Sequence, residues 1–457
     1  MKNFFGKKIE MTSGPIFKNL LSVALPLSLS GILQLLFNAA DLIVVGRFSH
    51  TPDESIAAVG SNGSLISLII NLAIGLSVGA NVVTAQALGA GDKEKVSRTV
   101  HTSVFIALVC GILMGFIVLI GAPTFLTWMK SPAGIIGKAS LYLRIYAFGI
   151  PANILYNFGA AILRAKGDTA RPMIYLTIAG VCNVALNVAL VLLGFDVAGV
   201  AIATIVSHYV SAILLILALT KETDETRLLP HLVKPHKAEL LAIIRIGLPS
   251  GLLSSCFSLS NVIIQTSIND FGEILVSANS VAGNIEGFCY TSLNAVALAC
   301  LSFTGQNFGA KKYRRIKQVA YCGFGLTFLV FLTVGGAIFL FREPLATLYN
   351  ANPEIVKHAA TRLFVIAPFY FLCGFNDVIS SGLRGMGRTV APMFITLFCT
   401  CAFRIIWVFT ACKMVHEPFM LYLSYPISWA LNLFICLIYF IIVYKKLRKT
   451  EQKNLPE

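Results

Sequence analysis

Residues 163–173 read LRAKGDTARPM, and residues 383–393, which lie 220 positions later, read LRGMGRTVAPM. Six of these eleven positions are identical between the two stretches. The same offset aligns further residues, so that Gln86, Gly89 and Ala90 meet Gln306, Gly309 and Ala310. A proline near the start of each half, Pro26 and then Pro249, recurs with three residues of drift. These matches predict a chain that is built as two repeated halves.

The composition indicates that a lipid bilayer is the main solvent of this protein. Of its 457 residues, 56% are hydrophobic and 12% are charged, whereas a soluble domain usually carries about 25% charge. A membrane helix needs roughly 20 mostly apolar residues. Such runs predict spans at 17–45, 55–84, 96–121, 136–162, 170–193, 198–220, 241–268, 275–303, 317–341, 357–382, 391–412 and 418–444.

The basic residues test this count of spans independently. Twenty-seven of the 36 lysines and arginines fall in seven alternate segments between the runs, and eight fall in the six others. Basic residues gather on cytoplasmic loops, so we expect a multi-pass protein of the plasma membrane with both termini in the cytoplasm. The net charge of +15 is explained by these loops, and no nucleic-acid partner is expected.

The repeat and the twelve runs together predict the fold class. We expect an all-α polytopic membrane protein with twelve transmembrane helices in two six-helix bundles. Because each half contains an even number of spans, the bundles should be related by a pseudo-two-fold axis along the membrane normal. The predicted domains are an N-terminal lobe at 1–220, a cytoplasmic linker at 221–240 and a C-terminal lobe at 241–457.

Three further features carry a resemblance to a known family. The first helix contains a proline and an acid, the second runs into VTAQALGAG at 83–91, and the sixth opens with AGVAIAT at 198–204. With the motif at 163–173, they resemble the multidrug and toxic compound extrusion (MATE) family, nearer its DinF-like bacterial branch than its NorM-like one. The resemblance covers essentially the whole chain. It implies an antiporter that exports amphiphilic or cationic small molecules by alternating access.

Asp41 is the acid that the sequence singles out. It lies within the first apolar run, about 15 residues beyond Pro26, and an unpaired carboxylate at the bilayer centre costs about 3 kcal/mol on insertion scales. We therefore expect Asp41 to face a cavity and to bind a proton or a sodium ion. The alternative is a solvated acid at the outer end of the helix, because Arg47 follows closely.

The resemblance also implies a cation site that draws on the fifth and sixth spans. The matching positions are Asn183, Asn187 and Thr204. The family often has Asp where this chain has Asn187, and hard cations prefer carboxylate oxygen, so H+ is favoured over Na+ as the coupling ion. In the alternative interpretation, the two asparagines are hydrogen-bonding contacts between helices.

The second half contains its own intramembrane charges. Arg404 is the only basic residue expected deep in a helix, so it should pair with an acid, and Asp377 is the natural candidate. NorM-like members carry their acid one turn earlier, where this chain has Cys373, so a structural salt bridge competes with a functional role. Glu286 is interpreted either as part of a substrate cavity and charge network or as an interfacial helix cap.

Pro26 and Pro249 are candidate gating residues, because proline removes a backbone hydrogen bond and lets a helix bend; a static kink is the alternative. No P-loop or HExxH motif occurs, so no enzyme, cofactor or metal site is expected, and we expect a monomer. Two alternative functions stay open: a flippase for lipid-linked saccharides from the same superfamily, and a non-transporting receptor or channel.

Overall fold

The computed structural model describes residues 9–49, 52–129, 134–415 and 417–453, and the first part of the predicted N-terminal arm lies outside them. These described residues are almost entirely helical and include no strand. The helices form two compact units. Residues 29–251 belong to the first unit, and residues 9–28 and 252–457 belong to the second. The limits of the two lobes and the linker, as predicted from the sequence, stay a prediction.

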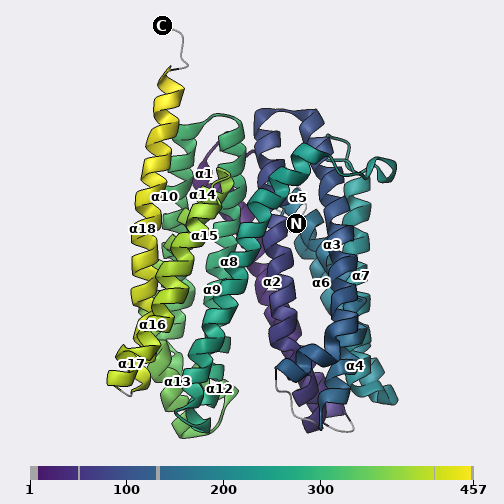
Figure 1. Ribbon diagram of the computed structural model, residues 1–457, viewed down its shortest axis with the longest axis vertical. Coiled ribbons are helices and arrows are strands. Elements are labelled where there is room, and N and C mark those ends of the chain that lie inside the picture. The colour runs from purple at the N-terminus through teal and green to yellow at the C-terminus, as the bar shows by residue number, and fades with distance from the viewer. Residues whose placement is uncertain (1–8, 50–51, 130–133, 416, 454–457) are drawn as a thin grey trace. The chain divides into compact units, whose positions relative to one another are not determined.

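The first unit contains the end of one helix, six complete helices and the start of another (Figure 1). They are the later part of α1 (Ile16–Phe48), α2 (Pro52–Ala90), α3 (Lys93–Trp128), α4 (Ile136–Ala147), α5 (Ile150–Lys166), α6 (Ala170–Leu190), α7 (Asp196–Thr220) and the beginning of α8 (Lys237–Asn269). Helix α5 packs against α2, α3 and α7, and so it forms the centre of this unit.

The second unit contains the start of α1, the remainder of α8 and the helices that follow. These are α9 (Glu273–Gly309), α10 (Tyr313–Val330), α11 (Gly336–Leu340), α12 (Arg342–Tyr349), α13 (Pro353–Ile366), α14 (Tyr370–Gly385), α15 (Val390–Thr396), α16 (Phe403–Phe409), α17 (Ala411–Met414) and α18 (Pro418–Lys453). Helix α9 packs against α10, α13 and α14. A π-helical turn at Leu397–Ala402 joins α15 to α16.

The predicted spans can be found in these helices. Ten helical stretches of the described chain are long and apolar enough to cross a membrane. One of them, Ala170–Thr220, contains both α6 and α7, which pack against each other because a turn with Gly194 at φ 86° reverses the chain between them. Helices α4 and α5, bent by 47°, form a further span as a pair. Counted in this way, the described chain accounts for all twelve spans.

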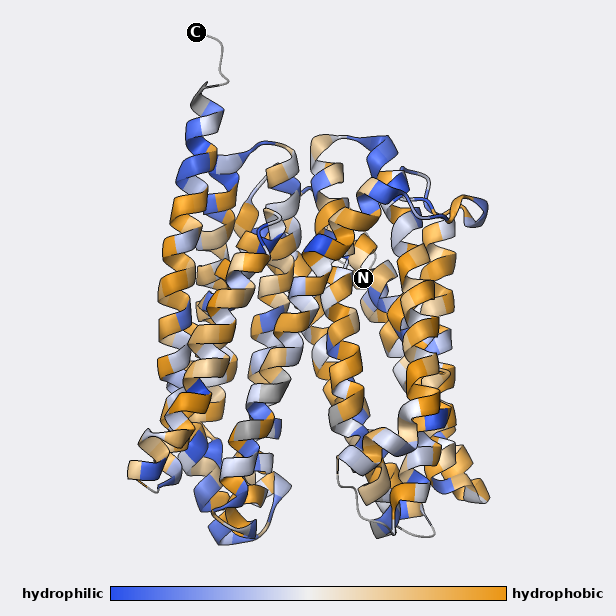
Figure 2. Cartoon of the chain, viewed as in Figure 1, coloured by the Kyte–Doolittle hydropathy of each residue, from blue (hydrophilic) through white to orange (hydrophobic). Residues whose placement is uncertain are grey.

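The outer surfaces of the helices are apolar. On α3, the side chains of Ile112, Phe116 and Ile120 are about three-fifths exposed and recur every four residues, so they line one face of the helix. Figure 2 shows hydrophobic residues along the helices and hydrophilic residues concentrated in the connections at their ends. An apolar face of this kind suits contact with lipid chains.

Glycines allow α2 and the start of α8 to approach each other closely within the first unit. A Cβ atom at Gly75 would lie 2.1 Å from the Cα of Gly251, and one at Gly79 would lie 2.2 Å from the Ile243 carbonyl oxygen. No other residue type fits at these positions without moving the backbone. Small residues in such places are typical of packed membrane helices.

The repeated motif folds in the same way in both units. After α5, Gly167 has φ 94° and donates to the Arg164 carbonyl at 3.0 Å. After α14, Gly387 has φ 76° and donates to the Arg384 carbonyl at 2.8 Å. This left-handed ending closes a helix with a glycine that no side chain hinders. The sequence repeat is therefore also a repeat of backbone conformation.

Candidate cation-coupling site

A glycine on α6 allows the later part of α1 to pack beside it. The Phe37 ring of α1 fills the space where a side chain at position 180 would be, so that a Cβ atom on Gly180 would lie 1.9 Å from a ring carbon. Asp41 follows Phe37 by four residues, which is about one helical turn. The contact at Gly180 therefore brings the Asp41 carboxylate to the α6 surface.

Three helices of the first unit contribute polar side chains to one cluster. The Asn187 amide of α6 donates hydrogen bonds to the Asp41 carboxylate of α1 and, at 3.3 Å, to the Asn183 side-chain oxygen. Asn183 in turn donates to the Thr204 hydroxyl of α7 at 3.4 Å. That hydroxyl donates to the Val200 carbonyl at 2.9 Å. The four predicted residues thus form a continuous chain of hydrogen bonds.

The orientation of the Asn187 amide is determined by its neighbours. Both of its acceptors are oxygen atoms, so its nitrogen must face them, and the opposite orientation would bring its oxygen against a carboxylate. Asn187 is fully buried, and its side-chain oxygen is enclosed and receives no hydrogen bond in the described chain. A buried acceptor without a donor carries a desolvation cost. The site therefore contains one oxygen that is ready to accept a hydrogen bond.

The chemistry of this cluster suits a proton or a hard cation. Its candidate ligands are the Asp41 carboxylate, the side-chain oxygens of Asn183 and Asn187, and the Thr204 hydroxyl, which are all oxygen atoms. Oxygen ligands are those that hard cations prefer. Only one of them carries a formal negative charge, and an amide N–H group already occupies one carboxylate oxygen. The structure brings the four predicted residues together, and their coupling role stays a prediction.

The two prolines lie inside continuous helices. Pro26 is within α1 and Pro249 is within α8. Neither residue can donate a backbone hydrogen bond, so each helix has a weakened point where the sequence predicted one. Gating by these residues stays a prediction.

Glu286 has a partner that the sequence analysis missed. Both of its carboxylate oxygens accept hydrogen bonds from Arg362 of α13, at 2.9 and 2.7 Å. Arg362 is only 5% exposed, so the prediction that Arg404 would be the only basic side chain deep in a helix was wrong. Helix α13 begins at Pro353, and Arg362 is therefore far enough along it to enter the packed interior. Arg362 lies within the predicted span 357–382, and this position was the signal in the sequence that could have indicated its burial.

The predicted salt bridge between Asp377 and Arg404 is not present among the described residues. Arg404 instead donates from Nε to the Ser428 hydroxyl at 3.0 Å and lies 4.2 Å from the centre of the Tyr425 ring. One carboxylate oxygen of Asp377 is enclosed without a hydrogen-bond partner. A sequence separation of 27 residues does not determine which faces of α14 and α16 meet, so the pairing could not be derived from the sequence.

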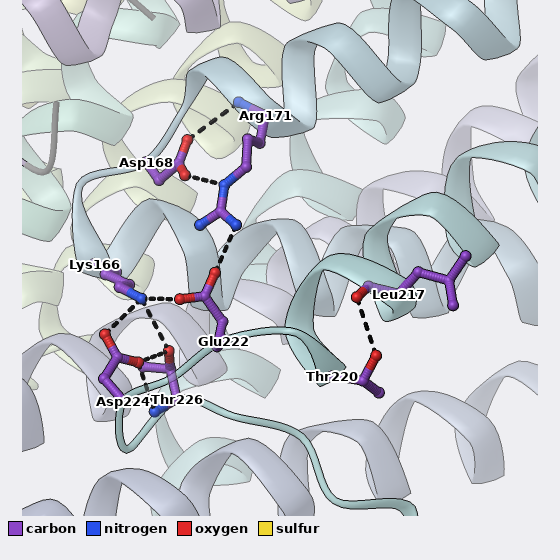
Figure 3. A network of polar contacts seen from close by, with 8 residues as sticks. All are labelled: Lys166, Asp168, Arg171, Leu217, Thr220, Glu222, Asp224 and Thr226. Carbon is purple, nitrogen blue, oxygen red and sulfur yellow. Dashed lines mark hydrogen bonds and ion pairs between the residues drawn. The ribbon is translucent and has the colours of Figure 1, made fainter. Parts of the chain in front are cut away.

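A second polar cluster lies where the α5–α6 turn meets the connection between α7 and α8 (Figure 3). Lys166, which is 8% exposed, forms ion pairs with Glu222 and, at 2.6 Å, with Asp224. Arg171 pairs with Asp168 and, at 2.6 Å, with Glu222. The second unit has Met386 and Arg388 at the positions equivalent to Lys166 and Asp168, so this network is absent from the repeat.

The same connection is also bound to α3. The His101 ring accepts a hydrogen bond from the Leu229 amide at 3.0 Å, and the Thr102 hydroxyl accepts one from the His236 amide at 3.1 Å. Burial alone would raise the pKa of Asp224, but its hydrogen bonds from Lys166 and Thr226 outweigh burial and hold it below its usual range. The residues between α7 and α8 are therefore a fixed part of the first unit.

The fold of this chain is that of membrane transporters with solved structures. Solved structures of MATE transporters match the fold: one described as an outward-facing multidrug resistance transporter has a TM-score of 0.90 at 24% identity and covers 97% of this chain and 99% of its own. A MATE structure in complex with MaD3S matches equally well, at 24% identity. The predicted fold class, twelve helices in two bundles, is thus confirmed.

The sequence comparison agrees with the structural one. Residues 26–189 and 249–410 match the MatE family model, and the chain belongs to this family of membrane transporters. A probable multidrug resistance protein NorM of Thermotoga maritima is 28% identical over 83% of this chain and 82% of its own length. The probable multidrug resistance protein YoeA of Bacillus subtilis is 26% identical over 94% and 95%. The nearer likeness to the DinF-like branch stays a prediction.

Proposed function

We propose that this protein exports amphiphilic or cationic small molecules in exchange for protons that bind at Asp41. The observation that carries the proposal is the contact between Asp41 and Asn187, beside which a buried amide oxygen lacks a donor. The curated relatives named as multidrug resistance proteins support the export of small molecules. An intramembrane acid is by default a candidate functional residue, because a charge in the membrane interior is costly.

A proton suits this site better than a sodium ion does. The Asn187 N–H group points at the carboxylate, and a metal ion on that oxygen would face a donor instead of a ligand. A proton on Asp41 creates an O–H donor, which needs an acceptor. Rotation of the Asn187 amide would supply its free oxygen and would break the bond to Asn183. Protonation would thereby weaken one polar link and create another.

The position of Asp41 on α1 connects this chemistry to movement. Pro26 lies on the same helix and leaves the Ser22 carbonyl without its usual helical donor, so α1 can bend there. In the proposed cycle, protonation of Asp41 changes how α1 is held by α6, and Pro26 absorbs the bend. Pro249 would play the corresponding part in α8. Alternating access requires such a two-state element.

We also infer a location in the plasma membrane, with both termini on the cytoplasmic side and a monomer as the working unit. The orientation is supported by the concentration of lysine and arginine in alternate connections. In the first unit, three of these basic segments, around 93–98, 164–171 and 221–237, lie at one end. The third segment is hydrogen-bonded to His101 and Thr102, which follow the first segment on α3, and forms an ion pair with Lys166 of the second.

Transport by the purified full chain in proteoliposomes tests the proposal. Ethidium movement is followed under a proton gradient alone, a sodium gradient alone, and neither, for the unchanged protein, for Asp41→Asn and for Asp270→Asn. Asp270 is an exposed acid at the end of α8 and serves as the matched control. We expect proton-driven transport to fall at least about tenfold, worth about 1.4 kcal/mol, in Asp41→Asn only. Undiminished transport by Asp41→Asn would exclude Asp41 as the coupling residue, and transport driven by sodium alone would exclude the proton.

The same preparation distinguishes the two alternative functions. A flippase for lipid-linked saccharides would move a pyrophosphate headgroup, which calls for several cationic side chains, whereas Glu286 already neutralises Arg362. Scrambling of a labelled lipid-linked saccharide would support that alternative. Single-channel currents in a planar bilayer would support a channel.

A further inference from the structure

Three charged side chains of the second unit, on α9, α13 and α16, are each less than one tenth exposed and lie around the Tyr425 ring or beside its neighbours. Glu286 is 8% exposed, Arg362 is 5% exposed and Arg404 is 2% exposed. Glu286 uses both oxygens to bind Arg362, so these two charges neutralise each other. No carboxylate in the described chain forms an ion pair with Arg404. The cluster therefore holds one positive charge in excess.

Arg404 is only partly satisfied by its neighbours. A guanidinium group has five N–H donors, and in the described chain Arg404 uses only Nε, which donates to the neutral Ser428 hydroxyl. The Tyr425 ring, 4.2 Å from the guanidinium carbon, offers a cation–π contact. Neither contact supplies a negative charge, and a buried cation without a counter-charge is strongly disfavoured. The described side chains that contact Arg404 therefore leave its positive charge unbalanced.

The side chains around Arg404 are held in place by their own contacts. Tyr425 also lies 5.5 Å from the Arg362 guanidinium, so the Glu286–Arg362 pair helps to fix the ring against which Arg404 lies. The terminal nitrogens of Arg404 have no bond but are not among the fully enclosed, unpartnered polar atoms. The Tyr422 ring lies 5.8 Å from the Arg362 guanidinium, and the Tyr422 hydroxyl is one of those enclosed atoms. The cluster thus contains hydrogen-bond donors without an acceptor on Arg404 and on Tyr422.

We propose that Arg404 binds the carboxylate of a transported molecule, so that the substrates include zwitterionic or anionic amphiphiles. A carboxylate carries the single negative charge that the cluster lacks, and it accepts two parallel N–H bonds from a guanidinium. A chloride ion shares the charge but not the two-point geometry. The aromatic rings of Tyr425, Tyr370 and Trp429, which lie in contact with one another, would pack against the apolar part of the ligand.

This inference goes beyond the proposed proton coupling, and the two can fail separately. Anion binding in the second unit is measured at equilibrium, without a gradient, whereas coupling at Asp41 is measured only as gradient-driven transport. Loss of coupling in Asp41→Asn would leave anion binding unchanged. Loss of anion binding would leave the proton response of Asp41 to be measured with ethidium, which carries no carboxylate.

Trp429 provides the reporter for the binding experiment. Its ring lies 5.9 Å from that of Tyr425, and the other two tryptophans, Trp128 and Trp407, can be replaced by phenylalanine. The full chain with this single tryptophan is titrated in detergent with sodium benzoate, with sodium chloride and with neutral benzamide. Sodium isethionate holds the ionic strength constant. Benzamide matches benzoate in size and ring but lacks the charge.

We expect a saturable fluorescence change with benzoate and little change with benzamide or chloride. Arg404→Gln should weaken benzoate binding at least about tenfold, as the loss of a charge-assisted hydrogen-bond pair implies, and Arg404→Lys should weaken it less. The matched control is Arg342→Gln, which removes another arginine with aromatic contacts, to Phe339 and Phe364. That control should bind benzoate normally.

Three results would overturn the proposal. Equal responses to benzoate and benzamide would show an apolar site, and this comparison needs no substitution at Arg404, so it decides even if Arg404→Gln does not fold. A response to chloride alone would assign the site to an inorganic anion instead of a substrate carboxylate. Unchanged benzoate binding by folded Arg404→Gln would exclude Arg404 as the anion ligand.

Discussion

Asn187 donates a hydrogen bond to Asp41, while the oxygen of the same amide lies buried and accepts none. The Asp41 carboxylate therefore faces the N–H donor of an amide and not a second carboxylate. The single negative charge is the physical reason for expecting protons and not sodium ions here. A change of one side chain should therefore change the preferred ion.

Asn187→Asp is expected to introduce sodium binding. Two adjacent carboxylates repel each other unless a cation lies between them, and with the oxygens of Asn183 and Thr204 they would form a set of hard ligands. We expect the sodium concentration for half-maximal binding to fall at least about tenfold, measured with radioactive sodium on the purified chain. Asn279→Asp, which changes another buried asparagine, is the control. Equal sodium binding by both variants would contradict the prediction.

Gly180→Ala should impair transport by displacing α1. The new Cβ atom would lie 1.9 Å from the Phe37 ring, and overpacking of this kind costs about 1–3 kcal/mol. Because Asp41 lies one turn from Phe37, its contact with Asn187 should weaken as well. Ethidium transport under a proton gradient is the measurement. Adding Phe37→Ala to Gly180→Ala should restore part of the rate, and a double variant no better than the single one would argue against this steric cause.

Lys166→Met should strongly destabilise the first unit. It installs the residue that the second unit has at the equivalent position 386, and it leaves Glu222 and Asp224 without their shared cation. Removing one partner of a buried ion pair costs about 3–5 kcal/mol. The melting temperature in detergent should fall by several degrees, whereas Lys221→Met, at an exposed lysine, should change it little. Equal melting temperatures for the two variants would contradict the buried network.

The stability of the first unit should decrease at acid pH because of Asp224. Its pKa is held below the usual range in the folded chain, so its contribution is fully present above its unfolded pKa of about 3.9. The contribution is lost as the pH falls through the lower folded-state value. Asp224→Asn should therefore melt below the unchanged protein at pH 7, and the difference should shrink below about pH 4. A difference that is independent of pH would exclude this linkage.

Lys311→Gly should stabilise the second unit. Lys311 has φ 56°, in the region that favours glycine, and the equivalent position of the first unit is Gly91 with φ 70°. A side chain in this conformation costs about 1–2 kcal/mol, so removing it should raise the melting temperature. Gly91→Lys is the reciprocal change and should lower it. If both substitutions shift melting in the same direction, backbone strain is not the cause.

The sequence predicted the fold well because the membrane restricts the solutions. Twelve apolar runs, the basic connections and the 220-residue repeat each reflect a constraint that acts along the chain, and the glycine endings at 167 and 387 repeat with them. The residues around Asp41 were predicted only through the family resemblance. The Arg362–Glu286 pair joins residues 76 positions apart, and the Lys166–Glu222 contact joins residues 56 apart. Such pairings depend on how helices rotate against one another, which the pattern of apolar residues does not determine.

The division of the chain into units has a consequence for its origin and biosynthesis. Residues 9–28 belong with the second unit, and residues up to 251 belong with the first. Two chains produced by a cut in the connection 221–236 would each lack a segment of one unit, so either half alone is incomplete and only co-expression can supply both. This reciprocal exchange is what fusion of a domain-swapped dimer of half-length chains would leave behind. The first unit thus contains residues from both halves of the sequence, and its chain is complete only after residue 251 has been synthesised.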